Sequence, residues 1–250
     1  MIDPNAPRVT FDEIDSTNAE AARRAAGGDA GPYWLRATRQ SAGRGRRGRT
    51  WTSEPGNLFI TYLGASAHPP GEIALLSFAA ALAVADVADS VIGRPVALVK
   101  WPNDVMVLGR KVSGILLESG ALGDGRTWIA VGVGINIASV PDGVDQPIAA
   151  LASFADGKAI SVDSVEQILR RRLGFWAGRY EREGFAPLRD AWLARAHGLQ
   201  APAVARVGQE EVSGVIRGLS SEGALELELP DGRTRLITAG EVFFGAPKAA

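Results

Sequence analysis

The sequence contains no cysteine, and His68 and His197 are its only histidines in 250 residues. The absence of cysteine excludes disulfide bonds, thiolate metal sites and cysteine nucleophiles, and it suits a cytoplasmic enzyme. His68 precedes two prolines and His197 ends a polar segment, so we interpret both as surface residues. A Ser-His-Asp triad or a multi-histidine metal site is therefore poorly supported.

An excess of charge is also absent, with Lys+Arg 27 against Asp+Glu 28 and a net charge of -1. A chain this close to neutral is not built to bind polyanions, so nucleic acid is not the expected partner. The longest apolar run, Ile73 to Ala85, is too short to cross a bilayer, and we predict a buried helix there. The N-terminus lacks the pattern of a secretory signal.

Periodicity predicts strands and helices in alternation. Thr17 and Glu20 have the spacing of a capping box, so we expect a helix from Thr17 that stops at Gly27. Long helices are also predicted from about Glu72 to Ile92 and from Asp163 to about Glu183. Strands are predicted at 8–14, 33–38, 57–64 and 95–100, followed by an antiparallel meander over 104–108, 111–119 and 127–137.

Beyond Ala201 the pattern changes to five short alternating segments broken by glycine, which is typical of a small barrel or sandwich. We therefore divide the chain into a large α+β domain, residues 1–200, and a small β domain, residues 201–250. The large domain is expected to hold a mixed, largely antiparallel sheet that carries helices.

The stretch "QSAGRGRRGRTW", Gln40 to Trp51, lies in a segment without acidic residues from Ala30 through Ser53. Its glycines free backbone N–H groups to approach phosphate or carboxylate oxygens, while its arginines add charge-assisted contacts. The pattern G-x-G-x-x-G within it is not the dinucleotide fingerprint, because no helical period follows the third glycine. Taken alone, the loop could equally be a solvated basic loop that touches RNA.

A second polar motif, "KWPND", places Lys100, Asn103 and Asp104 around a proline turn at a strand end, where side chains can project into a cleft. Lys111 follows in "KVSGIL", where Gly114 leaves room for a ligand against the strand. Either lysine alone would be an ordinary surface residue.

Together with "DSTN" (Asp15 to Asn18) and "GVGINI" (Gly132 to Ile137), these motifs closely resemble the biotin protein ligases in order and spacing. The resemblance covers nearly the whole chain. It implies the class II synthetase-like biotinyl/lipoyl ligase fold with an SH3-like C-terminal barrel. Because few residues precede Asp15, it also implies the monofunctional type without an N-terminal DNA-binding domain, so DNA and membranes are not expected partners.

The resemblance implies an ATP-dependent reaction: biotin attacks the α-phosphate of ATP, with Mg²⁺ bridging phosphates, and a lysine of a biotin carboxyl carrier domain takes the biotinyl group from the adenylate. It assigns catalysis to Lys111, Arg46 and Asp104. It assigns biotin to Ser16, Thr17, Gln40, Gly43, Arg44, Arg46, Lys111 and Gly114. It assigns ATP and the adenylate to Arg44, Arg46, Arg47, Arg49, Trp51, Asn103, Lys111 and Asn136.

Several points stay open. Asp104 could bind magnesium, orient the incoming amine or pair with Lys100, and no aromatic residue between Ile137 and Ser153 is present to stack on adenine. Pairing of two copies through their sheets is possible. A lipoate ligase and a non-catalytic nucleic-acid-binding module are the alternative functions.

The arginine loop should be mobile without ligand, because glycine-rich backbone loses much conformational entropy on ordering. We expect trypsin to cleave the loop readily, and biotin plus ATP to suppress this cleavage. Mass spectrometry of the fragments over time measures it, and cleavage unchanged by the two ligands would contradict the expectation.

Overall fold

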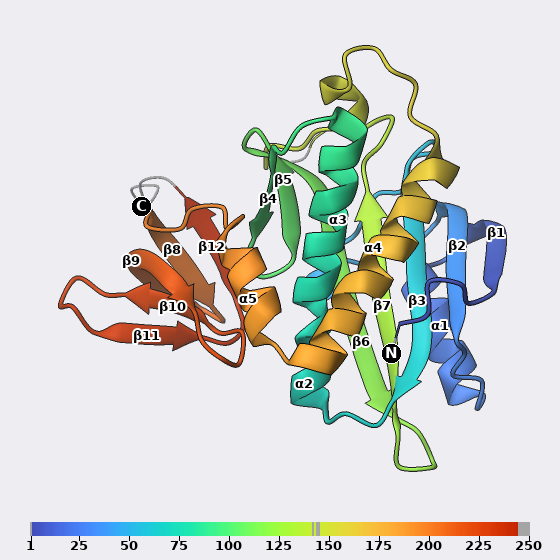
Figure 1. Cartoon of the computed structure of the whole chain (residues 1–250), viewed down its shortest axis with the longest axis horizontal. Coiled ribbons are helices and arrows are strands. Elements are labelled where there is room, and N and C mark those ends of the chain that lie inside the picture. Colours follow the sequence, from blue (N-terminus) through green and yellow to red (C-terminus); the bar gives the residue numbers. More distant parts are fainter. Residues whose placement is uncertain (1, 142, 144–145, 245–250) are drawn as a thin grey trace.

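The computed structural model describes residues 2–141, 143 and 146–244 (Figure 1). Its larger sheet has seven strands in the order β1-β2-β3-β7-β6-β5-β4. Neighbouring strands are antiparallel except for the parallel pair β1 and β2, which confirms the predicted fold class. The strands are β1 (Arg8–Ile14), β2 (Tyr33–Gln40), β3 (Leu58–Ser66), β4 (Ala97–Lys100), β5 (Asp104–Val107), β6 (Arg110–Ala121) and β7 (Thr127–Ile135).

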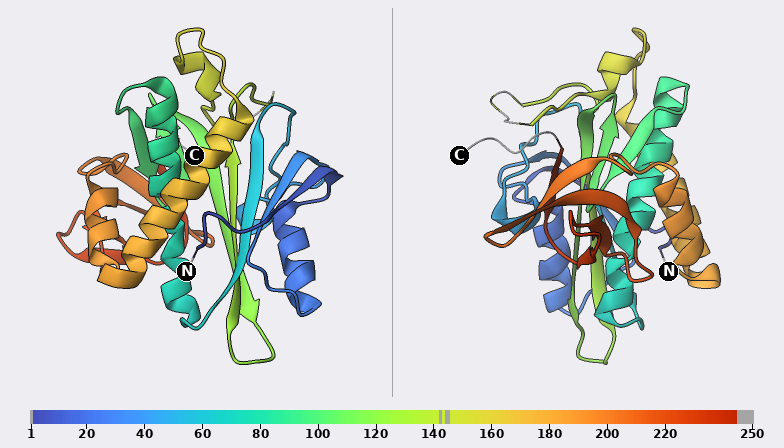
Figure 2. Two further views of the ribbon diagram at one scale, coloured as in Figure 1. Left: turned by 45° about the vertical axis from the view of Figure 1, so that its right-hand side comes forward. Right: turned by 90° about the vertical axis from the view of Figure 1, so that its left-hand side faces the viewer.

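Helices cover both faces of this sheet. The two longest, α3 and α4, lie side by side across one face, while α1 lies against the other (Figures 1 and 2). The α-helices are α1 (Thr17–Ala26), α2 (Pro70–Ala74), α3 (Leu76–Ile92), α4 (Val162–Glu183) and α5 (Ala186–Leu193), and short 3₁₀ helices are η1 (Arg46–Gly48) and η2 (Leu151–Phe154).

Two helices begin at caps other than the predicted ones. Ser16 caps α1 with an extended backbone, and its hydroxyl accepts a hydrogen bond from Ala19 N at 3.4 Å. Thr17 is instead the first helical residue, with its hydroxyl turned inward. Ser161 caps α4, two positions before the predicted start at Asp163. The pattern could not distinguish neighbouring polar residues that are all able to cap.

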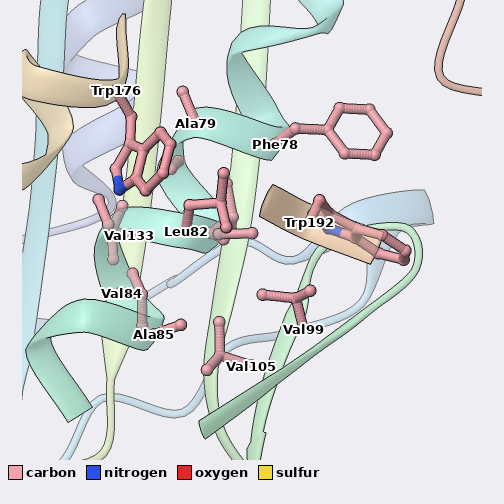
Figure 3. Close-up of a cluster of buried hydrophobic side chains, with 14 of the residues drawn as sticks. Phe78, Ala79, Leu82, Val84, Ala85, Val99, Val105, Val133, Trp176 and Trp192 are labelled. Atoms are coloured by element: carbon pink, nitrogen blue, oxygen red, sulfur yellow. The ribbon is translucent and has the colours of Figure 1, made fainter. Parts of the chain in front are cut away.

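The main core lies between the sheet and the pair α3 and α4. Val133 of β7, Leu82 of α3 and Trp176 of α4 meet there, within a cluster that continues to Val105 and Trp192 (Figure 3). Each such side chain contributes roughly 1.5–3 kcal/mol when it leaves water. Alternate residues of β7 face this core, so the residues between them face the other side of the sheet.

The apolar helical segment Pro70–Ile92, formed by α2 and α3, is long and apolar enough to cross a bilayer by length and composition alone, with a mean hydropathy of 1.9. This differs from the prediction, which counted the shorter run Ile73 to Ala85. In the fold, 67% of its most apolar window is buried. Since the sheet and α4 cover it, the segment is a core helix.

The opposite face of the sheet is only partly covered. A small cluster of α1 and sheet residues fills one end of this face: Ala21, Ala25, Leu35, Leu63 and Ala130. The other end of the face carries glycines instead of apolar side chains, and the arginine loop lies over it.

The C-terminal segment forms a separate sheet with the order β11-β10-β9-β8-β12, and its pairs are all antiparallel. Within the described residues β11 and β12 do not pair with each other, so the predicted barrel is not closed. Its apolar side chains join the main core around Phe78 and Trp192 instead. The strands are β8 (Pro202–Val207), β9 (Glu210–Leu219), β10 (Leu225–Glu228), β11 (Thr234–Ile237) and β12 (Glu241–Phe244).

His68 connects the start of α2 to α4. Its ring nitrogens lie 2.8 Å from Glu72 Oε2 and 2.9 Å from Glu181 Oε2. The hydrogen bond with Glu181, followed by that with Glu72, raises the pKa of His68 above its ordinary value. The predicted surface histidine therefore also bridges two helices.

A raised folded-state pKa means that His68 stabilises the fold fully below the unfolded pKa, and that this contribution is lost as pH rises through the folded pKa. We expect His68→Gln to lower the free energy of unfolding at about pH 6 by less than about 1 kcal/mol, because the ring is part-exposed. At about pH 9 the variant should equal wild type. Urea denaturation at both pH values measures this, and an equal loss at both would contradict it.

Candidate active site

The floor of the site is formed by glycines on two central strands. Gly114 of β6 and Gly134 of β7 are register partners, and Gly132 follows on the same face. A Cβ at Gly114 or Gly134 would lie 2.8 or 2.6 Å from ring atoms of Trp51, and one at Gly132 would lie 2.0 Å from Asn18 Oδ1. We call this surface the glycine face, and it lines a cavity of about 150 Å³.

One polar wall of the cavity is built around Gln40, at the end of β2. Gln40 Oε1 accepts hydrogen bonds from Thr17 N at 2.9 Å and from Thr17 Oγ1 at 3.1 Å. Its amide nitrogen donates to Ser53 Oγ at 3.0 Å. The start of α1 is thereby fixed to the chain that leaves the arginine loop.

The next part of this wall is built around Asn18. Thr61 donates to Asn18 Oδ1 at 2.7 Å, and the Thr61 and Thr17 hydroxyl oxygens are 2.8 Å apart. Asn18 Nδ2 donates to Glu118 Oε2 at 2.9 Å, and Arg44 donates to the other oxygen of Glu118 at 2.8 Å. Together with the Gln40 contacts, these bonds form a continuous chain from Ser53 to Arg44.

The arginine loop is a compact turn. Trp51 N donates to Gly43 O at 2.8 Å, and Gly45 N donates to Arg49 O at 2.7 Å. A Cβ at Gly43 would lie 2.2 Å from Trp51 O, so the two arms of the loop require glycine there. Arg47 adopts the left-handed conformation, with φ of 56°, at the tip of the turn.

The arginines of this loop go to four different places. Arg44 reaches Glu118, Arg46 Nη1 donates to Asn103 Oδ1 at 3.3 Å, and Arg49 forms an ion pair with Glu241 of the second sheet. Arg47 lines a second hollow and not the main cavity. Arg44, Arg46 and Arg49 line the main cavity, where Asn103 braces Arg46.

Lys111 reaches the cavity because of a β-bulge. Val105 pairs with Ser113 while Met106 pairs with Lys111, so Val112 is an extra residue in β6. The bulge reverses the alternation of side chains and places Lys111 on the same face as Gly114, three positions on. In a regular strand, residues three positions apart face opposite sides, so without the bulge the ammonium group would point to the apolar core.

The Lys111 ammonium lies 2.7 Å from Asp104 Oδ1, and the two side chains are 13% and 15% exposed. It also lies 5.5 Å from the centroid of a Trp51 ring, a cation–π distance. The ion pair expected for Asp104 was with Lys100, whereas the structure pairs Asp104 with Lys111. The indole N–H of Trp51 is buried and has no hydrogen-bond partner among the described residues.

Two cations in this region, Arg46 and Lys100, are held against the cost of burial. Burial, followed by the charge of Arg47, lowers the pKa of Arg46. Burial also lowers the pKa of Lys100, and Lys111 adds to this while Asp104 opposes it. An arginine remains protonated in proteins, so a lowered pKa means that its cation is held at a cost that an anion would relieve.

The structure brings most of the predicted site residues to one cavity. Ser16, Thr17, Gln40, Arg44, Arg46, Arg49, Trp51, Asn103, Lys111, Gly114 and Asn136 line it. Gly43, Arg47 and Asp104 do not: Gly43 lies against the backbone of Trp51, Arg47 lines the second hollow, and Asp104 is paired with Lys111. Among the described residues no group of three or more acidic or metal-ligating side chains could hold a metal ion.

Sequence reasoning missed Glu118, Thr61, Ser53 and Glu241. Glu118 had a usable signal, because it lies four positions after Gly114 on a strand and so shares its face. The other three take part through contacts between distant segments, which local patterns do not reveal.

Comparisons with known proteins match both parts of the chain. The Biotin/lipoate A/B protein ligase family model matches residues 10–136, and the Biotin protein ligase C terminal domain model matches residues 203–245. A biotin–acetyl-CoA-carboxylase ligase from Paracoccus denitrificans is 42% identical over 241 residues, which are 92% of this chain and 98% of the relative. The bifunctional ligase/repressor BirA of Escherichia coli is 33% identical over 234 residues, 92% of this chain and 71% of the relative.

Among solved structures, the biotin protein ligase from Aquifex aeolicus in complex with biotin and ATP matches with a TM-score of 0.80 at 25% identity, covering 95% of this chain and 97% of that one. The chain therefore belongs to the biotin/lipoate A/B protein ligase family.

The nearly buried pair of Asp104 and Lys111 should show strong coupling in stability. Removing one partner leaves the other charge uncompensated, so we expect Asp104→Asn and Lys111→Met each to lower the free energy of unfolding by about 2–4 kcal/mol. The double variant should lower it by clearly less than the sum of the two single losses. Urea denaturation of the four proteins measures the coupling, and additive losses would contradict the pairing.

Proposed function

We propose that this chain is a biotin protein ligase, which activates biotin with ATP as biotinyl-5′-AMP and transfers the biotinyl group to a lysine of a biotin carboxyl carrier domain. The observation that carries the proposal is the convergence of Arg46 and Lys111 on a cavity whose other wall is neutral and polar. This arrangement suits a ligand that is uncharged at one end and negatively charged at the other.

The biotin end belongs at the wall formed by Ser16, Thr17 and Gln40. These groups both donate and accept hydrogen bonds, as a ureido ring requires. Gln40 is already held by Thr17 and Ser53, so its amide is oriented before the ligand arrives. The glycine face gives the flat ligand room beside Gly114, with the loop at Gly43 closing the wall.

In the first step, a carboxylate oxygen of biotin forms a bond to the α-phosphorus of ATP as the bond to pyrophosphate breaks. No proton is transferred, so the residues need to neutralise charge and align the reacting groups. Lys111 and Arg46 supply cations at the junction of the two substrates, and Arg44 lies beside them on the loop. Asn103 holds Arg46 in place through its side-chain oxygen.

The nucleotide end belongs toward Asn136, which lines the same cavity after the end of β7. Ligand pockets commonly have volumes of about 300–1,000 Å³, so about 150 Å³ is little room for an adenylate. The indole of Trp51 occupies the glycine face, and we propose that it moves off this face and then contacts the adenylate. Arg47 and Arg49 would follow as the loop orders around the phosphates.

In the second step, the neutral lysine amine of the carrier attacks the biotinyl carbonyl carbon, the bond to AMP breaks with its electron pair leaving on AMP, and the nitrogen loses a proton to water. Asp104 lies beside Lys111 and keeps that ammonium at the acyl phosphate. The acceptor, by analogy with the names of the relatives, is the biotin carrier of a carboxylase.

We propose MgATP as the form of the nucleotide used. Mg²⁺ in such sites takes many of its ligands from phosphates and water, which fits a site without a protein cluster of metal ligands among the described residues. The carboxylate of Asp104 is engaged by Lys111, so we derive no step through the metal.

Biotin is favoured over the two alternatives. The relative from Paracoccus denitrificans and the solved structure from Aquifex aeolicus are biotin ligases rather than lipoate ligases. An RNA-binding loop would direct its arginines to the outer surface, whereas Arg44, Arg46 and Arg49 line the main cavity. We also propose a cytoplasmic location, and a division of labour in which residues 1–200 carry the chemistry and residues 201–250 support it.

Biotin-dependent exchange of pyrophosphate into ATP tests the proposed function. Lys111→Ala should slow exchange by about 100-fold or more, since it removes a cation aimed at the transition state. Arg46→Ala should release bound adenylate about 10- to 100-fold faster, because a buried charge-assisted contact is lost.

Arg126→Ala, in the exposed turn between β6 and β7, is the matched control and should behave as wild type. Absence of biotin-dependent exchange in wild type would overturn the proposal. Unchanged kinetics in both site variants would overturn the assigned roles.

A further inference from the structure

The arginine loop is tied to the second sheet. Arg49, which ends η1, forms an ion pair with Glu241 at the start of β12. The side chain of Glu241 is 21% exposed and that of Arg49 is 57% exposed. Glu241 is therefore the more fixed partner, anchored in a strand that pairs with β8 through the register partner Arg206.

Fixing Arg49 also fixes the turn that presents Arg46. Gly45 N donates to Arg49 O at 2.7 Å, and Arg49 N donates to Arg46 O at 3.2 Å. These bonds make Arg49 the closing residue of the turn. Any restraint on its side chain consequently limits the positions available to the Arg46 backbone, three residues earlier.

Glu241 also brings negative charge to the cation cluster. It acts on Arg46 and on Lys100 in the direction that favours their charged forms, against the effect of burial. Asp104 acts on both in the same direction from the opposite side. The second sheet thus supplies a counter-charge as well as an anchor.

A separate contact fixes the KWPND motif to the same sheet. Trp101 Nε1 donates to Gly223 O, in the turn between β9 and β10, at 3.3 Å. A Cβ at Gly223 would lie 2.8 and 2.9 Å from Phe78 and Leu75, so this turn is packed tightly against α3. Asn103, the brace of Arg46, is therefore held whether or not Glu241 is present.

We propose that Glu241 is a positioning residue for the ATP site: it holds the arginine loop through Arg49 and so sets the place of Arg46. This rests on the proposed function as far as the nucleotide is concerned. Biotin should depend on it little, because the Gln40 wall is held by its own hydrogen bonds.

The first test uses Glu241→Gln, Arg49→Gln and the double variant in the exchange assay. Glu241→Gln should raise KM for ATP about two- to fivefold, the range of a part-exposed ion pair, and leave KM for biotin unchanged. In the Arg49→Gln background the same change should have no further effect. The proposal would be overturned if Glu241→Gln raised KM for ATP equally in the wild-type and Arg49→Gln backgrounds. A rise in KM for biotin alone would also overturn it.

The second test needs no substrate. Trypsin cleavage after Arg47, followed by mass spectrometry, should be about two- to fivefold faster in Glu241→Gln than in wild type, with an unchanged melting temperature. Glu210→Gln, which removes an ion pair with Arg235 on the same sheet, is the matched control and should cleave as wild type does.

Equal cleavage in Glu241→Gln and wild type would overturn the holding role, as would equal acceleration in the control. If wild type fails to exchange pyrophosphate, the proposed function is wrong. The trypsin test then still decides whether Glu241 holds the arginine loop.

Discussion

Two neighbouring strands in the middle of the large sheet lack side chains on one face, and the candidate site depends on this absence. Gly114 and Gly134 are register partners, and Gly132 continues the same face. Any Cβ there would collide with Trp51 or Asn18. The backbone of the sheet can therefore approach a flat ligand, while α3 and α4 stabilise the sheet from the other side.

Because the glycine face offers no functional groups, charge has to come from its borders. The arginine loop contributes Arg46 from above the face, and the bulge in β6 contributes Lys111 from its edge. Neutral polar groups come from the start of α1 and the end of β2. This separation of neutral and cationic walls follows from which segments meet the sheet at each end.

Much of this arrangement could be predicted from sequence, because its signals are local. Alternation gave the strands, including β1 and the five strands of the second sheet, and the motifs indicated most of the cavity lining. Patterns could not choose between Ser16 and Thr17 as a cap. They also could not place Glu118 and Glu241, whose partners lie 74 and 192 residues away in the sequence, nor show that the second sheet stays open.

The extra residue at Val112 limits how β6 can vary in length. Lys111 and Gly114 share a face although three positions separate them, because the bulge takes up one residue. Deleting Val112 would leave a regular strand in which the two residues, then two positions apart, still share that face. Deleting two residues would make them neighbours and turn the ammonium group to the opposite face. Related chains that keep an ammonium group at this position should therefore have either the bulge or a segment one residue shorter.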